Sequence, residues 1–320
     1  MKIFITRKIP NRGIELLQGA GHEVVVSPHD QVLTPDELIS GGQRADAVLT
    51  QLTDKITRDV LEAWKPTVKI VANYAVGYDN IDVVAAKELG IVITNTPDVL
   101  TETVAEHAFA LMLSIAHRVV EADKFMRAGK YIGWEPELLL GTDLSHKTLG
   151  IVGLGRIGSL VAHHGAKGFN MRVLYYDVKR NENFEKEVSA EFRDTAEAVF
   201  EEADFISVHV PLLPTTRHLV NADLLRKMKP TAYLINTSRG PIVDEHALAE
   251  ALRDKVIKGA ALDVFENEPA MDPMLKDLDN VIVTPHIASA TEETRQRMGE
   301  VAAKNILAVL KNKAPANPVQ

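Results

Sequence analysis

The feature that most constrains the fold of this chain is the segment Thr148–Gly158, with the sequence TLGIVGLGRIG. A short apolar and β-branched run, Leu149–Val152, breaks into glycines, and an apolar stretch with helical character, Ser159–Phe169, follows it. This order predicts a strand, a tight turn and a helix.

The three glycines of this turn have separate physical roles in a dinucleotide site. Gly153 can adopt a backbone conformation that side chains disfavour, Gly155 lets a pyrophosphate approach the main chain, and Gly158 lets the helix pack closely against the strand. The free N–H groups at the start of the helix then face the anion. Because many glycine patterns are ordinary turns, the residues that follow decide between the two interpretations.

A carboxylate stands where a dinucleotide site needs one. The next predicted strand, Arg172–Tyr176, ends at Asp177, which lies 19 residues after Gly158. An acid at that strand end accepts hydrogen bonds from the adenosine ribose hydroxyls and repels a 2′-phosphate. We therefore expect NAD(H) as the preferred cofactor, with NADP(H) as a second option because Lys179 and Arg180 follow closely.

Composition and charge exclude several classes of function. The chain has 320 residues, enough for two domains, and its 46% hydrophobic and 25% charged residues are globular values. A formal net charge of −8 argues against nonspecific binding to nucleic acids or membranes, which are themselves anionic. Cysteine is absent, which excludes disulfides and zinc–cysteine sites, and no metal site is predicted.

Met1–Thr6 has the pattern of a strand rather than a leader, and no apolar run is long enough for a membrane span, so we expect a cytoplasmic protein.

Strand-like and helix-like segments alternate along the chain, which predicts an α/β fold with two doubly wound parallel sheets. The strands predicted for the first sheet are Lys2–Thr6, His22–Val26, Ala45–Leu49, Lys69–Asn73 and Ile91–Thr94. Six strands are predicted for the second sheet, at Leu149–Val152, Arg172–Tyr176, Phe205–Val208, Ala232–Asn236, Gly259–Asp263 and Val281–Thr284.

Two predicted helices determine the expected domain organisation. Residues 101–128 carry apolar side chains at helical spacing and are predicted to form one long helix that crosses between domains and packs against a second subunit. The last helix, Glu292–Leu310, is free to return to the first domain. We therefore expect a discontinuous, flavodoxin-like substrate domain, residues 1–99 with 288–320, into which a Rossmann dinucleotide-binding domain, residues 100–287, is inserted.

Polar residues follow the predicted ends of three strands in the second domain. Arg239 comes shortly after one strand, Glu268 lies in the loop that Asp263 opens, and His286 follows the last strand. The carboxyl ends of parallel strands share one edge of the sheet, which is where open α/β sheets bind ligands. We therefore expect these side chains to lie near the predicted cofactor.

An arginine, a glutamate and a histidine at this edge suit hydride transfer to a 2-keto acid. Arg239 can bind the substrate carboxylate through two parallel hydrogen bonds and polarise the neighbouring carbonyl. His286 can donate a proton to the carbonyl oxygen as hydride arrives, while Glu268 bonds the far ring nitrogen and fixes the tautomer. Each residue alone also has a structural explanation, as a turn residue, a solvated acid or a packed histidine, but their joint placement favours catalysis.

Five motifs of the sequence resemble those of the D-isomer-specific 2-hydroxyacid dehydrogenases. They are Gly153–Gly158, Asn236–Gly240, Leu262–Pro269, Thr284–Ile287 and, in the first domain, Asn73–Asp82. The resemblance covers nearly the whole chain. It implies that Arg239, Glu268 and His286 form the catalytic set.

The resemblance also implies substrate, cofactor and partner contacts. Backbone groups at Val76 and Gly77 would meet the substrate carboxylate together with Arg239. Homodimers built around the long helix are usual in this family, and Trp134 would reach the partner's active site or act as a packing anchor. The predicted cofactor contacts are Thr103, Gly153, Leu154, Gly155, Arg156, Ile157, Gly158, Asp177, Val210, Thr237, Ser238 and Asp263.

Within this family, the segment from Gly133 to Asp143 and the Val76–Gly77 loop look most like glyoxylate/hydroxypyruvate reductases, although those relatives often carry serine or arginine where Asp177 stands. Phosphoglycerate dehydrogenase and phosphite dehydrogenase are alternatives, but the first often has an appended regulatory domain and the second is expected to have lysine at position 76. Formate dehydrogenase fits less well because its histidine is expected with a glutamine. A non-enzymatic alternative is an NAD-sensing corepressor, yet no sequence feature indicates a peptide-binding cleft.

Overall fold

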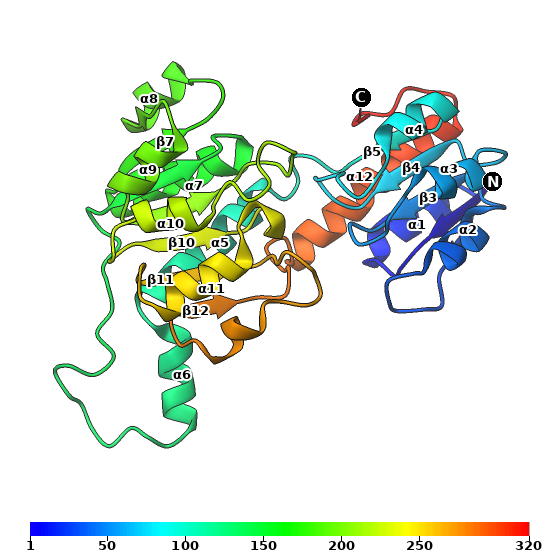
Figure 1. Ribbon diagram of the computed structural model, residues 1–320. Helices are drawn as coiled ribbons and strands as arrows, with labels where there is room; N and C mark the ends of the chain where they lie inside the picture. Colours follow the sequence, from blue (N-terminus) through cyan, green and yellow to red (C-terminus); the bar gives the residue numbers. More distant parts are fainter. Residues whose placement is uncertain (320) are drawn as a thin grey trace. The chain divides into compact units, whose positions relative to one another are not determined.

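A computed structural model describes residues 1–319 of the chain. It contains two compact units, one made of Met1–Leu100 with the segment from Ala290 to the C-terminus and the other of Thr101–Ser289. Each unit is a parallel β-sheet with helices on both faces (Figure 1). The predicted fold class is therefore confirmed. Among residues 1–319, no helix is both long and apolar enough to cross a bilayer.

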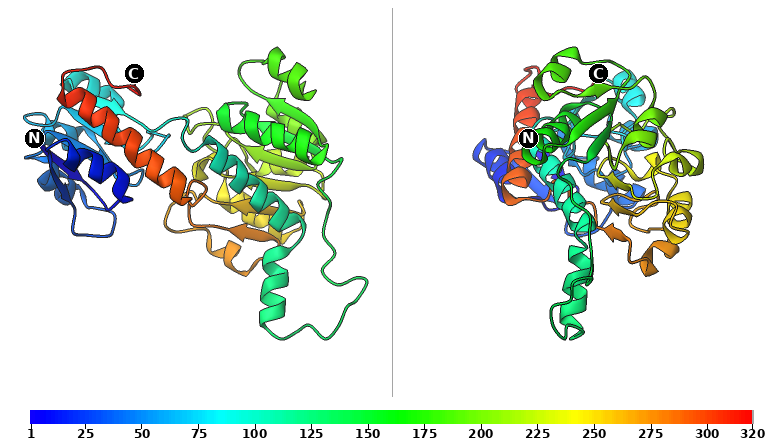
Figure 2. Two further views of the ribbon diagram at one scale, coloured as in Figure 1. Left: turned by 180° about the vertical axis from the view of Figure 1, so that it is seen from behind. Right: turned by 90° about the vertical axis from the view of Figure 1, so that its left-hand side faces the viewer.

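The first unit has a five-stranded sheet with the order β2-β1-β3-β4-β5, which is the flavodoxin-like order. Its strands are β1 (Lys2–Ile5), β2 (Glu23–Val26), β3 (Ala47–Thr50), β4 (Ile70–Asn73) and β5 (Val92–Thr94). Helices α1 (Asn11–Gly19) and α12 (Glu292–Leu310) lie side by side on one face, and α2 (Pro35–Gly42), α3 (Arg58–Trp64) and α4 (Val83–Leu89) cover the other (Figure 2).

A glycine contact explains how α12 packs so closely on α1. A Cβ atom at Gly13 of α1 would lie 2.5 Å from the carbonyl oxygen of Gly299 in α12. Only a residue without a side chain therefore allows the two helices to approach to this distance. The C-terminal helix, whose bounds agree with the predicted ones, thereby completes the layer on this face of the first sheet.

The second unit has a seven-stranded parallel sheet with the order β12-β11-β10-β9-β6-β7-β8. All strands run parallel, and the strand order changes direction between β6 and β9, which is the point where doubly wound sheets bind dinucleotides. The strands are β6 (Thr148–Val152), β7 (Arg172–Tyr176), β8 (Glu191–Phe192), β9 (Phe205–Val208), β10 (Tyr233–Asn236), β11 (Gly259–Leu262) and β12 (Val281–Val283).

The prediction of six strands in this sheet is wrong, because β8 adds a seventh at its edge. This strand is two residues long, and it pairs in parallel with β7 through Leu174 opposite Glu191 and Tyr175 opposite Phe192. Arg172 donates two hydrogen bonds of 2.7 Å to the Glu191 carboxylate. Two residues, one of them charged, are too few to show an alternating apolar pattern, so the sequence does not predict this strand.

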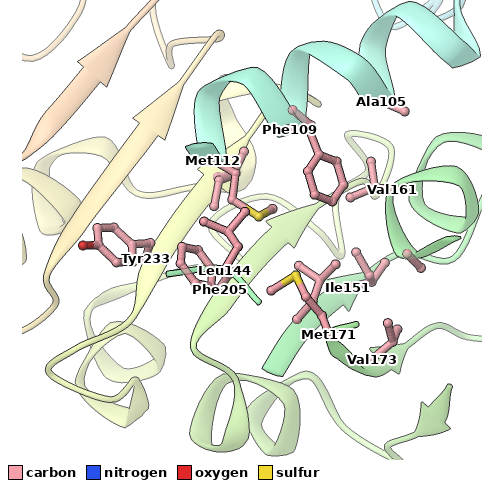
Figure 3. Close-up of a cluster of buried hydrophobic side chains, with 14 of the residues drawn as sticks. Ala105, Phe109, Met112, Leu144, Ile151, Val161, Met171, Val173, Phe205 and Tyr233 are labelled. Atoms are coloured by element: carbon pink, nitrogen blue, oxygen red, sulfur yellow. The ribbon is translucent and has the colours of Figure 1, made fainter. Parts of the chain in front are cut away.

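Two hydrophobic cores lie on the two faces of the second sheet. The helices on one face are α5 (Thr101–Ala116), α7 (Arg156–Phe169) and α8 (Glu182–Val188), and those on the other are α9 (Ala196–Glu202), α10 (Ala222–Lys227) and α11 (Glu245–Arg253). Figure 3 shows the first core, where Phe109 and Met112 of α5 meet Val161 of α7 over the strand residues Ile151 and Phe205. These cores hold the strands in place, so that the loops after them are presented at one edge.

The predicted single helix over residues 101–128 is wrong. The chain forms α5 and then a separate helix, α6 (Val119–Arg127), and between them Arg118 has a left-handed backbone with φ of +55°. The loop that returns after α6 supplies the reason, since the Thr142 N–H donates to the Ala116 carbonyl at 2.8 Å. Gly141 lies so near that carbonyl that its Cβ would be 2.5 Å away. This tertiary contact caps α5, and α6 projects from the rest of the unit (Figure 1).

Candidate active site

The turn between β6 and α7 has the conformation that its glycines allow. Gly153 has φ of +96°, and a Cβ there would lie 2.8 Å from the backbone of His209 and Val210. A Cβ at Gly158 would lie 2.1 Å from the Gly153 carbonyl oxygen, so α7 can approach the strand only without a side chain. At Gly155 a Cβ would meet nothing within 4 Å. The main chain is therefore open to a ligand at the position where a pyrophosphate is expected.

The N-terminus of α7 lacks a side-chain cap. Its N-cap residue is Gly155, and it shares the absence of a side-chain cap with α1, α3 and α6. By contrast, α2, α4 and each of α8 to α12 begin at a side chain that accepts a backbone N–H. Uncapped N–H groups at the positive end of a helix dipole form a binding site for an anion. The helix begins at Arg156, earlier than the predicted Ser159, because the last residues of the glycine motif are already helical.

Asp177 lies directly after β7 and is held beside the glycine turn. Its carboxylate accepts hydrogen bonds from the Leu154 N–H at 2.7 Å and from the Lys179 N–H at 3.1 Å. Arg180 is engaged elsewhere, since its guanidinium donates two hydrogen bonds of 2.8 Å to the carboxylate of Glu185. The geometry fits an acid that binds a ribose, and the arginine nearest to Asp177 in sequence is paired to another acid.

The core of the site is a hydrogen bond of 2.9 Å between Glu268 Oε2 and His286 Nδ1. The other carboxylate oxygen of Glu268 accepts the Phe265 N–H at 3.1 Å. Burial raises the pKa of Glu268, but the hydrogen bond and charge of His286, the Phe265 N–H and the charge of Arg239 together outweigh it and hold this pKa below its usual value. Because an ionised carboxylate only accepts, Nδ1 carries a hydrogen and Nε2 is left to exchange a proton with a substrate.

The backbone of His286 adopts a left-handed conformation, with φ of +53°. Its N–H donates to the carbonyl oxygens of Asp263 at 2.8 Å and Thr284 at 3.0 Å. The buried Asp263 carboxylate accepts the N–H groups of Ile287 at 2.9 Å and Ala288 at 2.7 Å. Burial raises the pKa of Asp263, but these and its other hydrogen bonds lower it by more. Asp263 therefore holds the loop in a conformation that costs energy for a residue with a side chain.

The turn after β10 carries Arg239 and packs directly on the Glu268 loop. Asn236 donates a hydrogen bond of 3.0 Å to the Arg239 carbonyl, and the Arg239 guanidinium donates one of 2.8 Å to the Ser238 carbonyl. A Cβ at Gly240 would lie 1.9 Å from the carbonyl of Phe265, so the two backbones leave no room for a side chain. The structure thus brings together the three predicted catalytic residues at the carboxyl edge of β10, β11 and β12.

The other residues predicted to contact cofactor or substrate lie after strands, in α5 and in the loop after α6. Val210 follows β9, and Thr237 follows β10. The Thr237 hydroxyl is buried and has no hydrogen-bond partner in the protein, which is expected of a group that binds a ligand. Thr103 lies in the first turn of α5. Trp134 is 81% exposed in the loop after α6. The open Gly155 backbone, the uncapped helix and the Thr237 hydroxyl fit a dinucleotide.

Val76 and Gly77 belong to the first unit, where two asparagines hold their loop. Asn73 donates to the Gly77 carbonyl at 2.9 Å, and Asn95 donates to the Val76 carbonyl at 2.8 Å. Carbonyl oxygens repel a carboxylate and N–H groups attract it, so tying up both carbonyls makes the loop compatible with an anion. The role of Asn95 is not predictable from the sequence, because an amide after a strand is typical of an ordinary turn.

A second site residue that no sequence pattern indicates is His107 of α5. Its Nε2 lies 3.4 Å from the Thr284 hydroxyl and 3.5 Å from a carboxylate oxygen of Asp263. It thus contacts the acid that holds the His286 loop. The apolar positions alone predict the helix, and no spacing in the sequence distinguishes this histidine.

Comparison with known proteins agrees with this geometry. Residues 109–288 match the family model described as D-isomer specific 2-hydroxyacid dehydrogenase, NAD binding domain. The chain is 49% identical to a glyoxylate reductase of Korarchaeum cryptofilum, over 99% of this chain and 95% of the relative. It is 48% identical to a glyoxylate reductase of Pyrococcus furiosus, over 98% of this chain and 94% of the relative.

Solved structures show the same likeness over the full chain. A protein of Thermus thermophilus superposes with a TM-score of 0.94 at 42% identity, with 100% of both chains covered. An NADPH-dependent glyoxylate/hydroxypyruvate reductase of Sinorhizobium meliloti, in complex with NADP and malonate, superposes with a TM-score of 0.87 at 34% identity, over 99% of this chain and 96% of that one. On its fold, its site and these relatives, the chain belongs to the D-isomer-specific 2-hydroxyacid dehydrogenase family.

Proposed function

We propose that this protein reduces a small 2-keto acid, glyoxylate or hydroxypyruvate, to the corresponding D-2-hydroxy acid with NAD(P)H. The observation that carries the proposal is the Glu268–His286 hydrogen bond of 2.9 Å, on the same sheet edge as Arg239 and the glycine turn. Curated relatives named glyoxylate reductase, 46% to 49% identical over nearly the full chain, support the choice of substrate.

Each of the three side chains has one task in the proposed reaction. The bound nicotinamide supplies the hydride. Arg239 binds the substrate carboxylate and draws electron density from the adjacent carbonyl. His286 donates its Nε2 proton to the carbonyl oxygen as negative charge develops there. Glu268 holds the Nδ1–H and stabilises the charged imidazole before this transfer, so that the acid is ready when substrate binds.

The polar contacts around the predicted cofactor residues support a preference for NAD(H). Asp177 brings a negative charge to the end of β7, where it repels a 2′-phosphate. The pairing of Arg180 with Glu185 strengthens this preference, because the arginine closest in sequence is already bound to a carboxylate. NADP(H) remains a second, weaker cofactor in this proposal.

The α6 region supports the proposal that the protein forms a homodimer. No residue of α6 is buried within its own chain, and Ile132 and Trp134 in the following loop are 90% and 81% exposed. Large apolar side chains exposed close together in sequence are typical of a protein–protein interface. A second copy of the chain is the proposed occupant, in keeping with the predicted packing of this region.

Steady-state kinetics test the proposed function. Oxidation of NADH and of NADPH is measured against glyoxylate, hydroxypyruvate, pyruvate and 3-phosphohydroxypyruvate. We expect the highest kcat/KM with NADH and one of the first two acids. A preference for the phosphorylated acid would contradict the proposal and indicate a phosphoglycerate dehydrogenase. The absence of turnover with every acid would favour phosphite as substrate or a binding role.

A further inference from the structure

The carboxylate of Glu245 joins the two ends of the loop that carries Glu268. Glu245 is the first residue of α11, and only 6% of its surface is exposed. One carboxylate oxygen accepts the Glu266 N–H at 2.7 Å, and the other accepts the Asp272 N–H. Within the loop, the Ala270 N–H donates to the Asn267 carbonyl at 2.9 Å. Glu268 therefore lies in a closed turn whose ends share one anchor.

A buried carboxylate at this place is held by strong interactions. Burial of a charge is costly unless the charge is hydrogen-bonded, and here both oxygens accept a backbone N–H. The position at the start of α11 also suits a negative charge, because the helix dipole is positive there. Removing the carboxylate would take this acceptor from two partly buried N–H groups, which costs more than the bonds themselves contribute.

Neighbouring side chains restrain one end of the loop further. The Glu266 carboxylate accepts hydrogen bonds from Arg217 at 2.9 Å and from His218 at 2.7 Å. The main chain of the same residue is bound to Glu245, so this end of the loop is held twice. Asp272, at the other end, bonds with His246 at 2.9 Å. The turn between these ends is left with little freedom to move.

This anchoring reaches the proposed proton donor through two short steps. Phe265, which precedes the anchored residue Glu266, donates its N–H to one carboxylate oxygen of Glu268, and the other oxygen bonds His286. A Cβ at Gly240 would lie 1.9 Å from the Phe265 carbonyl, so the Arg239 turn is packed on the same segment. One stretch of chain thus presents Arg239 at its beginning and the anchor Glu245 at its end.

We propose that Glu245 is a positioning residue of the active site, which acts through Glu268 to hold His286 in the orientation that proton transfer requires. The proposal rests on the proposed catalytic roles of Glu268 and His286. A displacement of a catalytic group by about 1 Å lowers a rate by about 100-fold. A single buried carboxylate that binds both ends of the loop prevents such a displacement.

The experiment is a double-mutant cycle with Glu245→Gln, Glu268→Gln and the double variant. Glutamine keeps the shape of the side chain but offers only one acceptor oxygen, and its amide group faces an N–H donor. We expect Glu245→Gln to lower kcat by about 10- to 100-fold with NADH affinity unchanged, and to shift the pH profile of kcat/KM toward that of Glu268→Gln. In the Glu268→Gln background, the same change should have little further effect, because both substitutions act through the Glu268–His286 hydrogen bond.

Glu250→Gln is the matched control, since Glu250 lies on the same helix with its side chain 51% exposed. Its kcat and pH profile should remain those of the unmodified protein. Thermal unfolding and NADH titration establish that each variant is folded, and Glu245→Ala, which removes both acceptors, should lower kcat more than Glu245→Gln. An unchanged kcat and pH profile in Glu245→Gln, or losses that multiply fully in the double variant, would overturn the role of Glu245. Full activity of Glu268→Gln would instead overturn the proposed mechanism, and this inference with it.

Discussion

His286 combines a proposed chemical task with an uncommon backbone conformation, and the two must be separated by experiment. Its φ of +53° lies in the left-handed region, which asparagine tolerates better than most residues with a side chain. Replacement by asparagine therefore removes the imidazole while the loop keeps its shape. The hydrogen bonds from the loop backbone to Asp263 do not depend on the identity of this side chain.

We expect His286→Asn to lower kcat by about 100- to 10,000-fold, the range for loss of a general acid, and to leave NADH binding intact. Stopped-flow or steady-state kinetics with fluorescence titration of NADH measure both quantities. His146→Asn is the matched control, because His146 also has a positive φ, of +63°, and is exposed. Turnover of His286→Asn near that of the control would remove His286 from the mechanism.

Site residues that act through contacts between distant parts of the chain cannot be predicted from local sequence patterns. Arg239, Glu268 and His286 were predicted because each follows a strand end that could be recognised locally. His107, Asn95 and the anchor Glu245 act through hydrogen bonds to backbone or side chains in other elements. No local pattern distinguishes them from an ordinary helix residue, turn amide or helix-start acid.

At the scale of elements, the loop after β7 contains the determinants of cofactor choice. Asp177 faces the glycine turn, and the guanidinium of Arg180 is bound by Glu185. The hydrogen bonds from Arg180 lower the pKa of Glu185 to about 2, so this carboxylate stays charged and bound to the arginine at neutral pH. Both features act against a 2′-phosphate.

We expect Asp177→Ala to raise the ratio of kcat/KM for NADPH to that for NADH by about 10-fold, which corresponds to about 1.4 kcal/mol. Adding Glu185→Gln should raise the ratio further, because the released Arg180 can bind the phosphate. Calorimetry with 2′-phosphorylated and unphosphorylated adenosine ribonucleotides measures the same preference without turnover. An unchanged ratio in both variants would show that this loop does not set the preference.

Ion pairs stabilise the short edge strand β8, which at two residues has few backbone hydrogen bonds to β7. Glu191 accepts hydrogen bonds from Arg172 at 2.7 Å and from Arg193 at 3.0 Å. The Arg172 hydrogen bond, followed by the contribution of Arg193, lowers the pKa of Glu191 to about 2 despite partial burial. A carboxyl group with a lowered pKa stabilises the fold above its ordinary pKa, and this contribution is lost as the pH falls through the lowered value.

We therefore expect Glu191→Gln to lower the melting temperature at pH 6, and the difference from the unmodified protein to shrink as the pH falls from about 4.5 toward about 2. Calorimetric melting over this pH range measures the difference. Glu197→Gln, a change at an exposed acid in the first turn of α9, is the control. A difference that persists undiminished at the lowest pH would contradict the assigned role of the ion pairs.

At the scale of the whole molecule, the exposed apolar surface of α6 and its loop predicts the oligomeric state. Val119 and Met126 on α6 are 51% and 57% exposed, and Ile132 and Trp134 extend the same apolar composition into the loop. Ile132→Asp places a charge in the middle of this proposed interface, where its burial would be costly.

Light scattering with size-exclusion chromatography should show a dimer of the unmodified protein and a monomer of Ile132→Asp at micromolar concentration. Val178→Asp is a suitable control, because Val178 is 95% exposed and lies outside this region. The control should remain dimeric. A monomeric unmodified protein, or a dimer that survives Ile132→Asp, would contradict the proposed interface.

The sequence by itself determined the fold class, the glycine turn with its acid, and the three catalytic candidates, because all of them depend on local patterns of strands, turns and strand ends. Only the tertiary structure decided that the predicted long helix ends at Ala116, whose carbonyl accepts the Thr142 N–H, and that β8 joins the sheet. The tertiary structure also placed Asp263 and Glu245 as anchors of the His286 and Glu268 loops. Such features arise from hydrogen bonds between segments distant in the sequence, and folding alone brings these segments together.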